Sequence, residues 1–213
     1  MNQGAGFFSG ERWLSRADFQ SRVLRAGNVL ASFGVGPGDA VALLLRNDFC
    51  FLEATYGANL VGAYAVPINW HSTNDELGYL LEDSQPRVLV GHADLLAGVS
   101  AALSDSKRRG MEVLVVETAP ELAAAYNLTK EVCVPRGNDH YLWNTVIDNA
   151  SELKDHRAEV IQSMFYTSGT TGSPKGVRRL AQSKRDAENL GRVRDRIFGL
   201  KPGISALVPG PLY

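Results

Sequence analysis

The sequence predicts an α/β fold with a largely parallel sheet and helices on both faces. Short apolar runs recur at residues 40–45, 63–66, 87–90 and 112–116, as expected for strands that are buried on both sides. Between them lie longer stretches whose apolar residues recur at intervals of three and four, the spacing of helices packed on one side. Strands that alternate with helices in this way form parallel sheets covered on both faces.

The helices of residues 1–116, which we take as the α/β core, carry recognisable start and stop signals. Ser15 with Asp18 three residues later caps a helix that ends at Gly34, and Thr73 with Glu76 forms a capping box before another. Residues 49–61 and 93–109 are the remaining predicted helices. Together with the four strands, these helices account for almost the whole of this part of the chain.

The alternation stops after residue 116 and resumes at residue 160. Residues 117–159 contain two prolines, Pro120 and Pro135, and a short helical pattern at 141–149, and we expect a variable connection that runs over the surface. Residues 160–213 then hold a strand at 160–165, a glycine-rich loop, a second strand around Val177, a helix that starts at Ser183 and a last strand at 205–208.

The glycine-rich loop concentrates chemistry that binds anions. Residues 166–176 read YTSGTTGSPKG. Glycines let the backbone approach a ligand and turn its N–H groups inward, hydroxyls add donors and can ligate Mg²⁺, and Lys175 adds a charge on a flexible stem. The pattern is not the common phosphate loop, because Pro174 rather than glycine precedes Lys175 and Gly176 follows it. We interpret it as a nucleotide phosphate loop, with a flexible surface loop as the alternative.

Other candidate residues give weaker signals. Arg178 and Arg179 follow the loop, where they would either reinforce phosphate binding or be solvated at a strand edge. The four histidines have no metal-ligand spacing, so we expect ordinary surface or loop roles for His71, His92, His140 and His156. Cys50 lies in an apolar run and is expected to be a buried small hydrophobe.

Charge and composition exclude several classes of partner. The formal net charge is −1, so neither a nucleic acid nor an acidic membrane surface is an implied partner. No apolar run reaches the length of a membrane span. The first residues lack the basic region and apolar core of a signal peptide, and the two cysteines are far apart, so we expect a cytoplasmic protein.

The loop also resembles a family signature. YTSGTTGSPKGV is similar to the signature of the adenylate-forming (AMP-binding) superfamily, which includes acyl- and aryl-CoA synthetases. Three further segments resemble that family in the family order, namely residues 34–39 (GVGPGD), 66–81 (from VPINW to ELGYLL) and 210–213 (GPLY). The resemblance covers almost the whole chain, from about Trp13 to Tyr213.

The resemblance implies a division of roles within the loop. It implies that the β- and γ-phosphates of ATP are wrapped by Thr167, Ser168, Gly169, Thr170, Thr171 and Gly172, with Thr167 also as the Mg²⁺ contact. Lys175 would be the catalytic cation that neutralises the leaving pyrophosphate, and Gly176 would permit close approach of the backbone. The implied reaction joins a carboxylic acid, of fatty or related type, to coenzyme A through an acyl-adenylate.

The resemblance also implies that part of the machinery lies elsewhere. In the family, the adenine and ribose motifs, the acidic Mg²⁺ partner and the lysine of the C-terminal lid follow the segment that ends this chain. We therefore expect an N-terminal portion of the large domain that is inactive alone. The alternatives are an acyl-AMP ligase or amino-acid adenylation domain that loads a carrier protein, and a short non-catalytic nucleotide-binding or partner protein.

Overall fold

A parallel sheet lies at the centre of the protein. The computed structural model describes residues 4–107, 110–135, 140–155, 163–167, 175–178, 184–199, 201 and 203–213. Within these ranges the sheet has the order β4-β3-β5-β6-β7, and all of its strands run parallel. Its members are β3 (Ala40–Leu44), β4 (Tyr64–Pro67), β5 (Val88–His92), β6 (Glu112–Val116) and β7 (Tyr141–Leu142).

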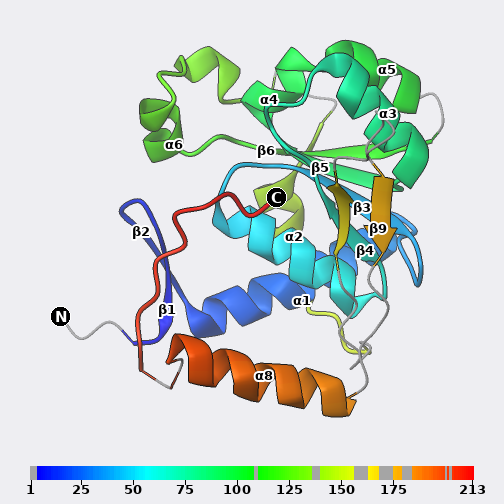
Figure 1. Ribbon diagram of the computed structural model, residues 1–213. Coiled ribbons are helices and arrows are strands. Elements are labelled where there is room, and N and C mark those ends of the chain that lie inside the picture. The colour runs from blue at the N-terminus through cyan, green and yellow to red at the C-terminus, as the bar shows by residue number, and fades with distance from the viewer. Residues whose placement is uncertain are drawn as a thin grey trace.

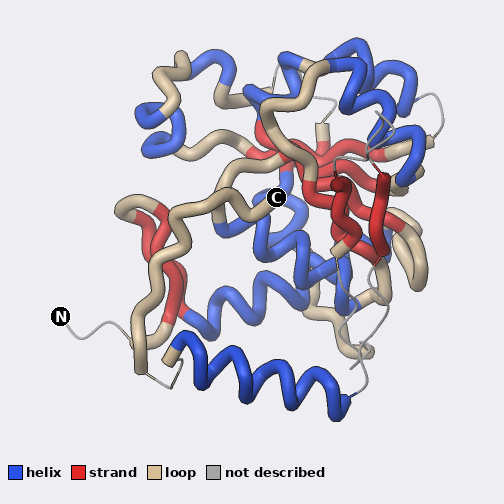
Figure 2. Tube along the Cα trace, viewed as in Figure 1, coloured by secondary structure: helices blue, strands red, loops and turns tan. Residues whose placement is uncertain are grey.

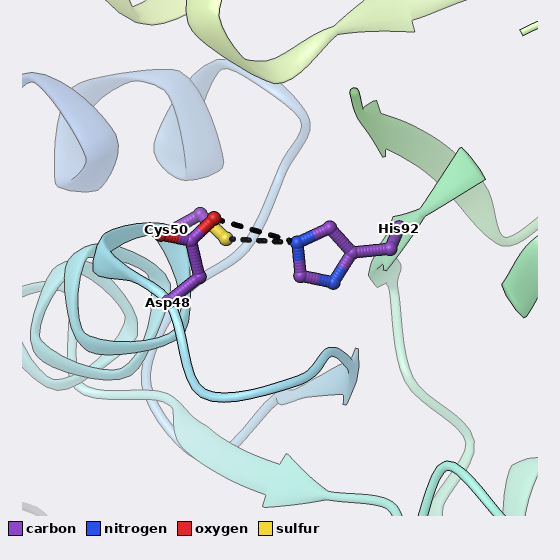
Figure 3. Close-up of side chains that lie close together, drawn as sticks. All are labelled: Asp48, Cys50 and His92. Carbon is purple, nitrogen blue, oxygen red and sulfur yellow. Dashed lines mark hydrogen bonds and ion pairs between the residues drawn. The ribbon is translucent and has the colours of Figure 1, made fainter. Parts of the chain in front are cut away.

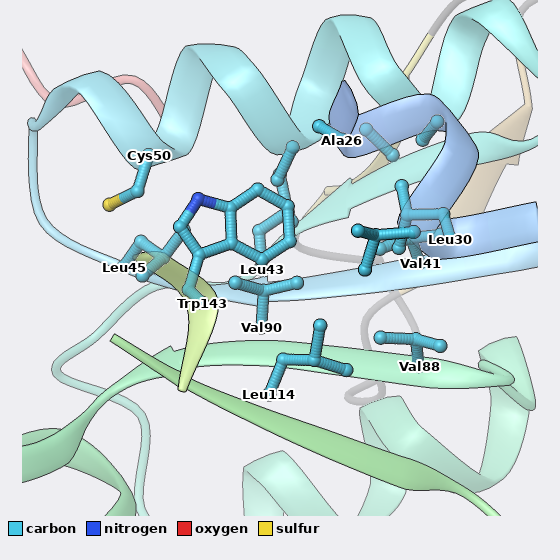
Figure 4. Close-up of a cluster of buried hydrophobic side chains, with 14 of the residues drawn as sticks. Ala26, Leu30, Val41, Leu43, Leu45, Cys50, Val88, Val90, Leu114 and Trp143 are labelled. Carbon is cyan, nitrogen blue, oxygen red and sulfur yellow. The ribbon is translucent and has the colours of Figure 1, made fainter. Parts of the chain in front are cut away.

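Helices cover both faces of this sheet, so the predicted α/β class is confirmed. One face packs on α1 (Arg16–Ser32), α2 (Phe49–Leu60) and α7 (Trp143–Asn149), and the other on α3 (Asn74–Ser84), α4 (Ala93–Gly98) and α5 (Ser100–Lys107). Figure 1 shows α3, α4 and α5 on the opposite side of the sheet from α1 and α2. Alternate residues of β3 divide between two cores, because Val41 and Leu43 join one cluster and Ala42 and Leu44 join the other. Figure 4 shows the cluster on the α1 and α2 side.

The predicted helix starts are present in the structure. The Ser15 hydroxyl accepts a hydrogen bond from the Asp18 backbone N–H, and Thr73 and Glu76 form the reciprocal capping box at the start of α3. The α1 and α2 helices cross closely. A Cβ at Gly57 would lie 2.8 Å from the Cβ of Ala26, so this crossing requires glycine.

Three sequence-based assignments are wrong. The helix expected at 93–109 is divided by Val99 into α4 and α5. Residues 205–208 form no strand, and Figure 2 shows the segment as a loop. The strand before the glycine-rich loop is β8 (Met164–Thr167), which pairs antiparallel with β9 (Lys175–Arg178) in a separate sheet instead of continuing the parallel one. Residues 160–162 lie outside the described ranges.

Several elements were not expected. An N-terminal hairpin is formed by β1 (Gly6–Ser9) and β2 (Arg12–Ser15). Within the predicted surface connection, α6 (Pro120–Ala125), the 3₁₀ helix η1 (Lys130–Val132) and β7 were not expected, whereas α7 matches the helical pattern at 141–149. The side chain of Trp143 at the start of α7 is fully buried, so this part of the connection belongs to the core.

The last helix, α8 (Lys184–Phe198), has an exposed apolar side. Leu190, Val193, Ile197 and Phe198 are each more than half exposed. Its expected N-cap, Ser183, lies outside the described residues. Within the described parts of the chain, no helix combines the length and apolarity needed to cross a bilayer.

Candidate functional site

The β8–β9 hairpin carries the glycine-rich stretch at its tip. The two strands pair so that Thr167 lies opposite Lys175, and Tyr166 opposite Gly176. Thr167 and Lys175 are therefore cross-strand neighbours at the two ends of residues 168–174. In such a pair the Cα atoms are about 5 Å apart, and the residues that connect them lie outside the described part of the chain.

The structure describes only part of the predicted site. Lys175 is exposed, which leaves its ammonium available to a ligand, and the Gly176 backbone follows it in β9. For Thr167 the structure gives the backbone of β8. Outside the described residues lie Ser168, Gly169, Thr170, Thr171 and Gly172. The Mg²⁺ role of Thr167 and the phosphate contacts of these five residues stay predictions.

Gly176 also has a packing role that the sequence did not indicate. A Cβ at this position would overlap Cε of Met164, and it would lie 3.1 Å from Cζ of Tyr166 and 3.3 Å from Oδ2 of Asp83. The absence of a side chain at residue 176 therefore lets Met164 and Tyr166 of β8 pack closely over β9, at a point that Asp83 of α3 also approaches.

Tyr166 connects the hairpin to α3. Its hydroxyl donates a hydrogen bond to Oδ2 of Asp83 at 2.6 Å. Burial, followed by this hydrogen bond and the charge of Asp83, raises the pKa of Tyr166 above its ordinary value. Tyr166 therefore stays protonated and acts as a donor. On the other strand, the guanidinium of Arg178 lies 5.2 Å from the ring centroid of Tyr64, while Arg179 lies outside the described residues.

The carboxyl edge of the parallel sheet is the second place where a site could form. Numbered along the chain, its strands are in the order 2-1-3-4-5, which places the topological switch point between β3 and β5. Open α/β sheets bind ligands at that point. Here it is filled by Arg46, whose Nη1 lies 2.7 Å from Oδ2 of Asp94 and whose guanidinium is covered by the rings of Trp70 and Tyr126 at 5.0 and 4.4 Å.

Asp48, Cys50 and His92 form a buried cluster beside Arg46, so the surface or loop role expected for His92 is wrong. His92 Nε2 lies 3.6 Å from Oδ2 of Asp48 and 3.8 Å from Sγ of Cys50, as Figure 3 shows. Burial disfavours the Asp48 carboxylate, but the interactions with His92 and with the charge of Arg12 outweigh burial and hold the pKa of Asp48 below its ordinary value.

Cluster geometry alone would suit a small metal ion, since the three ligand atoms lie within 4.8 Å of one another. The hydrogen bonds favour a different assignment. Nδ1 of His92 accepts the backbone N–H of Arg46 at 3.2 Å, so in neutral His92 the proton is on Nε2, the nitrogen that faces Asp48 and Cys50. A metal needs that nitrogen deprotonated. Burial, the largest effect, and the nearby carboxylates raise the pKa of Cys50 well above its ordinary value, which also disfavours a thiolate ligand.

A cavity of about 950 Å³ opens beside this cluster. Its wall includes Asp48, Cys50 and the ends of β6 and η1. Several ionic groups along the wall are paired. Arg12 contacts Asp48 and Glu121, and Arg22 contacts Glu53. No spacing in the sequence signals this cavity, because its lining comes from separate parts of the chain.

The last residues of the chain return to the carboxyl edge of the sheet. Asn47 follows β3, and its amide donates to the carbonyl of Gly210 at 2.8 Å and accepts the N–H of Leu212 at 3.0 Å. Leu212 also packs against the core on the α1 and α2 side. Residues 210–213, one of the segments that carry the family resemblance, are therefore fixed close to the strand ends, where Figure 1 places the C-terminus.

Comparison with known proteins establishes the family. Residues 3–184 match the AMP-binding enzyme family. The chain therefore belongs to the AMP-binding enzymes, and the resemblance to the adenylate-forming superfamily is confirmed.

Individual relatives are CoA ligases. A 4-hydroxybenzoate–CoA/benzoate–CoA ligase of Rhodopseudomonas palustris is 31% identical over 188 residues, 87% of this chain and 32% of the relative. A medium/long-chain-fatty-acid–CoA ligase of Mycobacterium tuberculosis is 30% identical over 168 residues, 78% of this chain and 25% of the relative. The structure of the anthranilate CoA ligase AuaEII with anthranoyl-AMP is 25% identical, with a TM-score of 0.66 over 82% of this chain and 31% of its own. The chain thus spans a third or less of these relatives.

Proposed function

We propose that this chain provides the pyrophosphate-side half of an ATP-dependent acyl-CoA synthetase. The observation that carries the proposal is the β8–β9 hairpin, which sets Thr167 opposite Lys175 at the base of residues 168–174 in a chain of the AMP-binding family. The exposed ammonium of Lys175 fits an anion held above that base. The reaction is attack of a carboxylate on the α-phosphorus of ATP with loss of pyrophosphate, followed by transfer of the acyl group to the CoA thiol.

In this reaction the residues of the hairpin stabilise charge. Lys175 would neutralise the departing pyrophosphate, and the backbone and hydroxyl groups of residues 167–172 would donate to phosphate oxygens. The Thr167 hydroxyl would be the contact within this chain for Mg²⁺, which would supply charge neutralisation at the phosphates. We expect the cytoplasm as the compartment, since both cysteines are free thiols.

The test is ATP–pyrophosphate exchange by the protein expressed from its complete gene, with Lys175→Ala against wild type. Loss of a group that stabilises developing charge lowers the rate by about 10²–10³-fold. Lys154→Ala, which removes another exposed lysine, is the matched control and should exchange at the wild-type rate. Wild-type exchange by Lys175→Ala would contradict the proposal.

Two further measurements define the acid and the acceptor. Both a fatty and an aromatic CoA ligase are similar to this chain. Residues 209–213 resemble the corresponding segment of CoA ligases that act on fatty and related acids, so we propose a fatty or related carboxylic acid as the substrate. Exchange should therefore be faster with a fatty acid than with benzoate. Acyl transfer to free CoA, rather than to a phosphopantetheinyl carrier protein, would support the CoA assignment. Residues 1–213 alone should form no thioester.

A further inference from the structure

The contact between Asp83 and Tyr166 joins two segments that are 83 residues apart. Asp83 lies in the last turn of α3, where the negative end of the helix dipole disfavours a carboxylate. Its oxygen instead accepts the Tyr166 hydroxyl at 2.6 Å, a length typical of a strong bond to a charged acceptor. A carboxylate at an unfavourable helix position that makes one short long-range bond indicates a role for that bond.

The bond acts next to the loop that the proposed function places on phosphate. Tyr166 is one residue before Thr167, and its register partner Gly176 is one residue after Lys175. One residue of a strand spans about 3.3 Å. Fixing the side chain of Tyr166 therefore fixes the two strand ends from which residues 168–174 start and to which they return.

The surrounding side chains hold the hairpin against the rest of the protein at Tyr166. Tyr166 packs against the core that contains Leu77, Leu80 and Leu81 of α3, and also against the small cluster of Ala40, Val66 and Met164. The absence of a side chain at Gly176 leaves the space in which Asp83 Oδ2 approaches.

We propose that Asp83 is a positioning residue for the phosphate-binding loop. It holds Tyr166, and through Tyr166 the ends of β8 and β9, against α3. The proposal rests on the proposed function of the hairpin, and it adds a residue from α3 to that site. Asp83 acts through Tyr166 by reducing the freedom of the ends of β8 and β9, which lowers the entropic cost of binding ATP there.

The experiment compares Asp83→Ala, Asp83→Asn and Tyr166→Phe in the protein expressed from its complete gene. The control is Asp75→Ala, which removes an exposed carboxylate at the other end of α3. Asparagine keeps an oxygen that can accept the Tyr166 hydroxyl, whereas alanine does not. Exchange kinetics give KM for ATP and for the acid separately, and hydrogen–deuterium exchange reports on the amides of residues 164–167 and 175–178.

Loss of the hydrogen bond should have the same effect whether Asp83 or Tyr166 is replaced. Asp83→Ala and Tyr166→Phe should each raise KM for ATP about fivefold, with KM for the acid unchanged, and should speed amide exchange in β8 and β9 by a similar factor. The double variant should be no worse than either single one. Asp83→Asn should stay within about twofold of wild type, and Asp75→Ala should match wild type.

Several results would overturn the positioning role. They are an unchanged KM for ATP in Asp83→Ala, unchanged amide exchange in β8 and β9, or an Asp83→Asn variant as impaired as Asp83→Ala. Failure of the proposed function has a different signature, in which wild-type protein shows no ATP–pyrophosphate exchange with any acid. The amide exchange of β8 and β9 still decides in that case whether Asp83 holds the hairpin.

Discussion

Glu53 links three helices, and its replacement by alanine should destabilise the fold strongly. It is buried in α2, where its carboxylate accepts Arg22 Nε at 2.6 Å and Arg22 Nη2 at 3.2 Å from α1, and Trp143 Nε1 at 2.9 Å from α7. Burial alone would lower the pKa of Arg22, but the hydrogen bond and charge of Glu53 outweigh burial and the pKa is raised. Arg22 also reaches Asp148 and Asn144.

The magnitude follows from what the substitution leaves behind. In Glu53→Ala the indole N–H of the fully buried Trp143 loses its acceptor, which costs about 1–3 kcal/mol. Breaking a buried ion pair costs about 3–5 kcal/mol, but the Arg22 side chain is 21% exposed and keeps its two other partners. We therefore expect a loss of about 3 kcal/mol in the free energy of unfolding. Glu53→Gln keeps the volume and an acceptor, and should lose about half as much.

The assay is equilibrium urea unfolding followed by far-UV circular dichroism, which avoids any signal that depends on Trp143. Combining Glu53→Ala with Trp143→Phe should show a coupling energy of about 1 kcal/mol, because the phenyl ring needs no acceptor. Glu152→Ala, which removes an exposed glutamate paired with Ser21, is the control. A Glu53→Ala protein within about 0.5 kcal/mol of wild type, or one equal to Glu53→Gln, would refute the reasoning.

Two further substitutions test the packing and the buried polar cluster. Gly57→Ala should lower the free energy of unfolding by about 1–3 kcal/mol, because the new methyl would lie 2.8 Å from the Cβ of Ala26; an unchanged urea midpoint would contradict this close crossing. The pKa of Asp48 is below its ordinary value of 3.8, so its carboxylate stabilises the fold above that pH, and the stabilisation is lost as the pH falls through the lowered pKa. Asp48→Asn should therefore be less stable than wild type at pH 7 and lose less stability between pH 4 and pH 2, measured by urea unfolding; parallel pH profiles would count against the pairing with Arg12 and His92.

The sequence predicted those parts of the fold that are encoded locally. Residues 40–45 form a continuous apolar run, and such a run specifies a strand buried on both faces whatever follows it. The Ser15 and Thr73 caps use side chains that bond within the same turn of helix. In each of these cases the partners lie within a few residues of one another, so their pattern is visible in the sequence.

The incorrect or missing secondary-structure predictions have different causes. The β1–β2 hairpin has a usable signal, since Gly10 adopts a positive φ of 59° in a tight turn between two short apolar segments. Residues 205–208 had the composition of a strand, but a strand also needs a partner for its backbone. No ladder forms there in the described structure, and Leu207 is 87% exposed. The predicted helix at 93–109 was divided at Val99, and Gly98 directly before the break is a helix-end signal that the prediction overlooked.

In the candidate site, too, the locally encoded features were predicted and those that depend on distant residues were not. The chemistry of residues 166–176 could be predicted from the sequence because a phosphate loop needs glycine, hydroxyl and lysine within a short stretch. The attachment of this hairpin to α3 could not be predicted. It depends on Asp83, and nothing in the sequence around Asp83 signals a partner 83 residues away.

The parallel sheet contributes a scaffold more than a binding surface. Sheets of this strand order bind ligands between the carboxyl ends of the strands that correspond to β3 and β5. Here Arg46, Asp48 and His92 lie at that point: the Arg46 guanidinium pairs with Asp94, and His92 contacts Asp48 and accepts the backbone N–H of Arg46. The exposed cation next to the glycine-rich loop is instead on the antiparallel hairpin beside β4. Because a hairpin of two short strands is only marginally stable on its own, we expect its attachment to α3 through Tyr166 to determine how firmly β8 and β9 are held. A substitution in α3 should therefore change ATP binding without touching ATP.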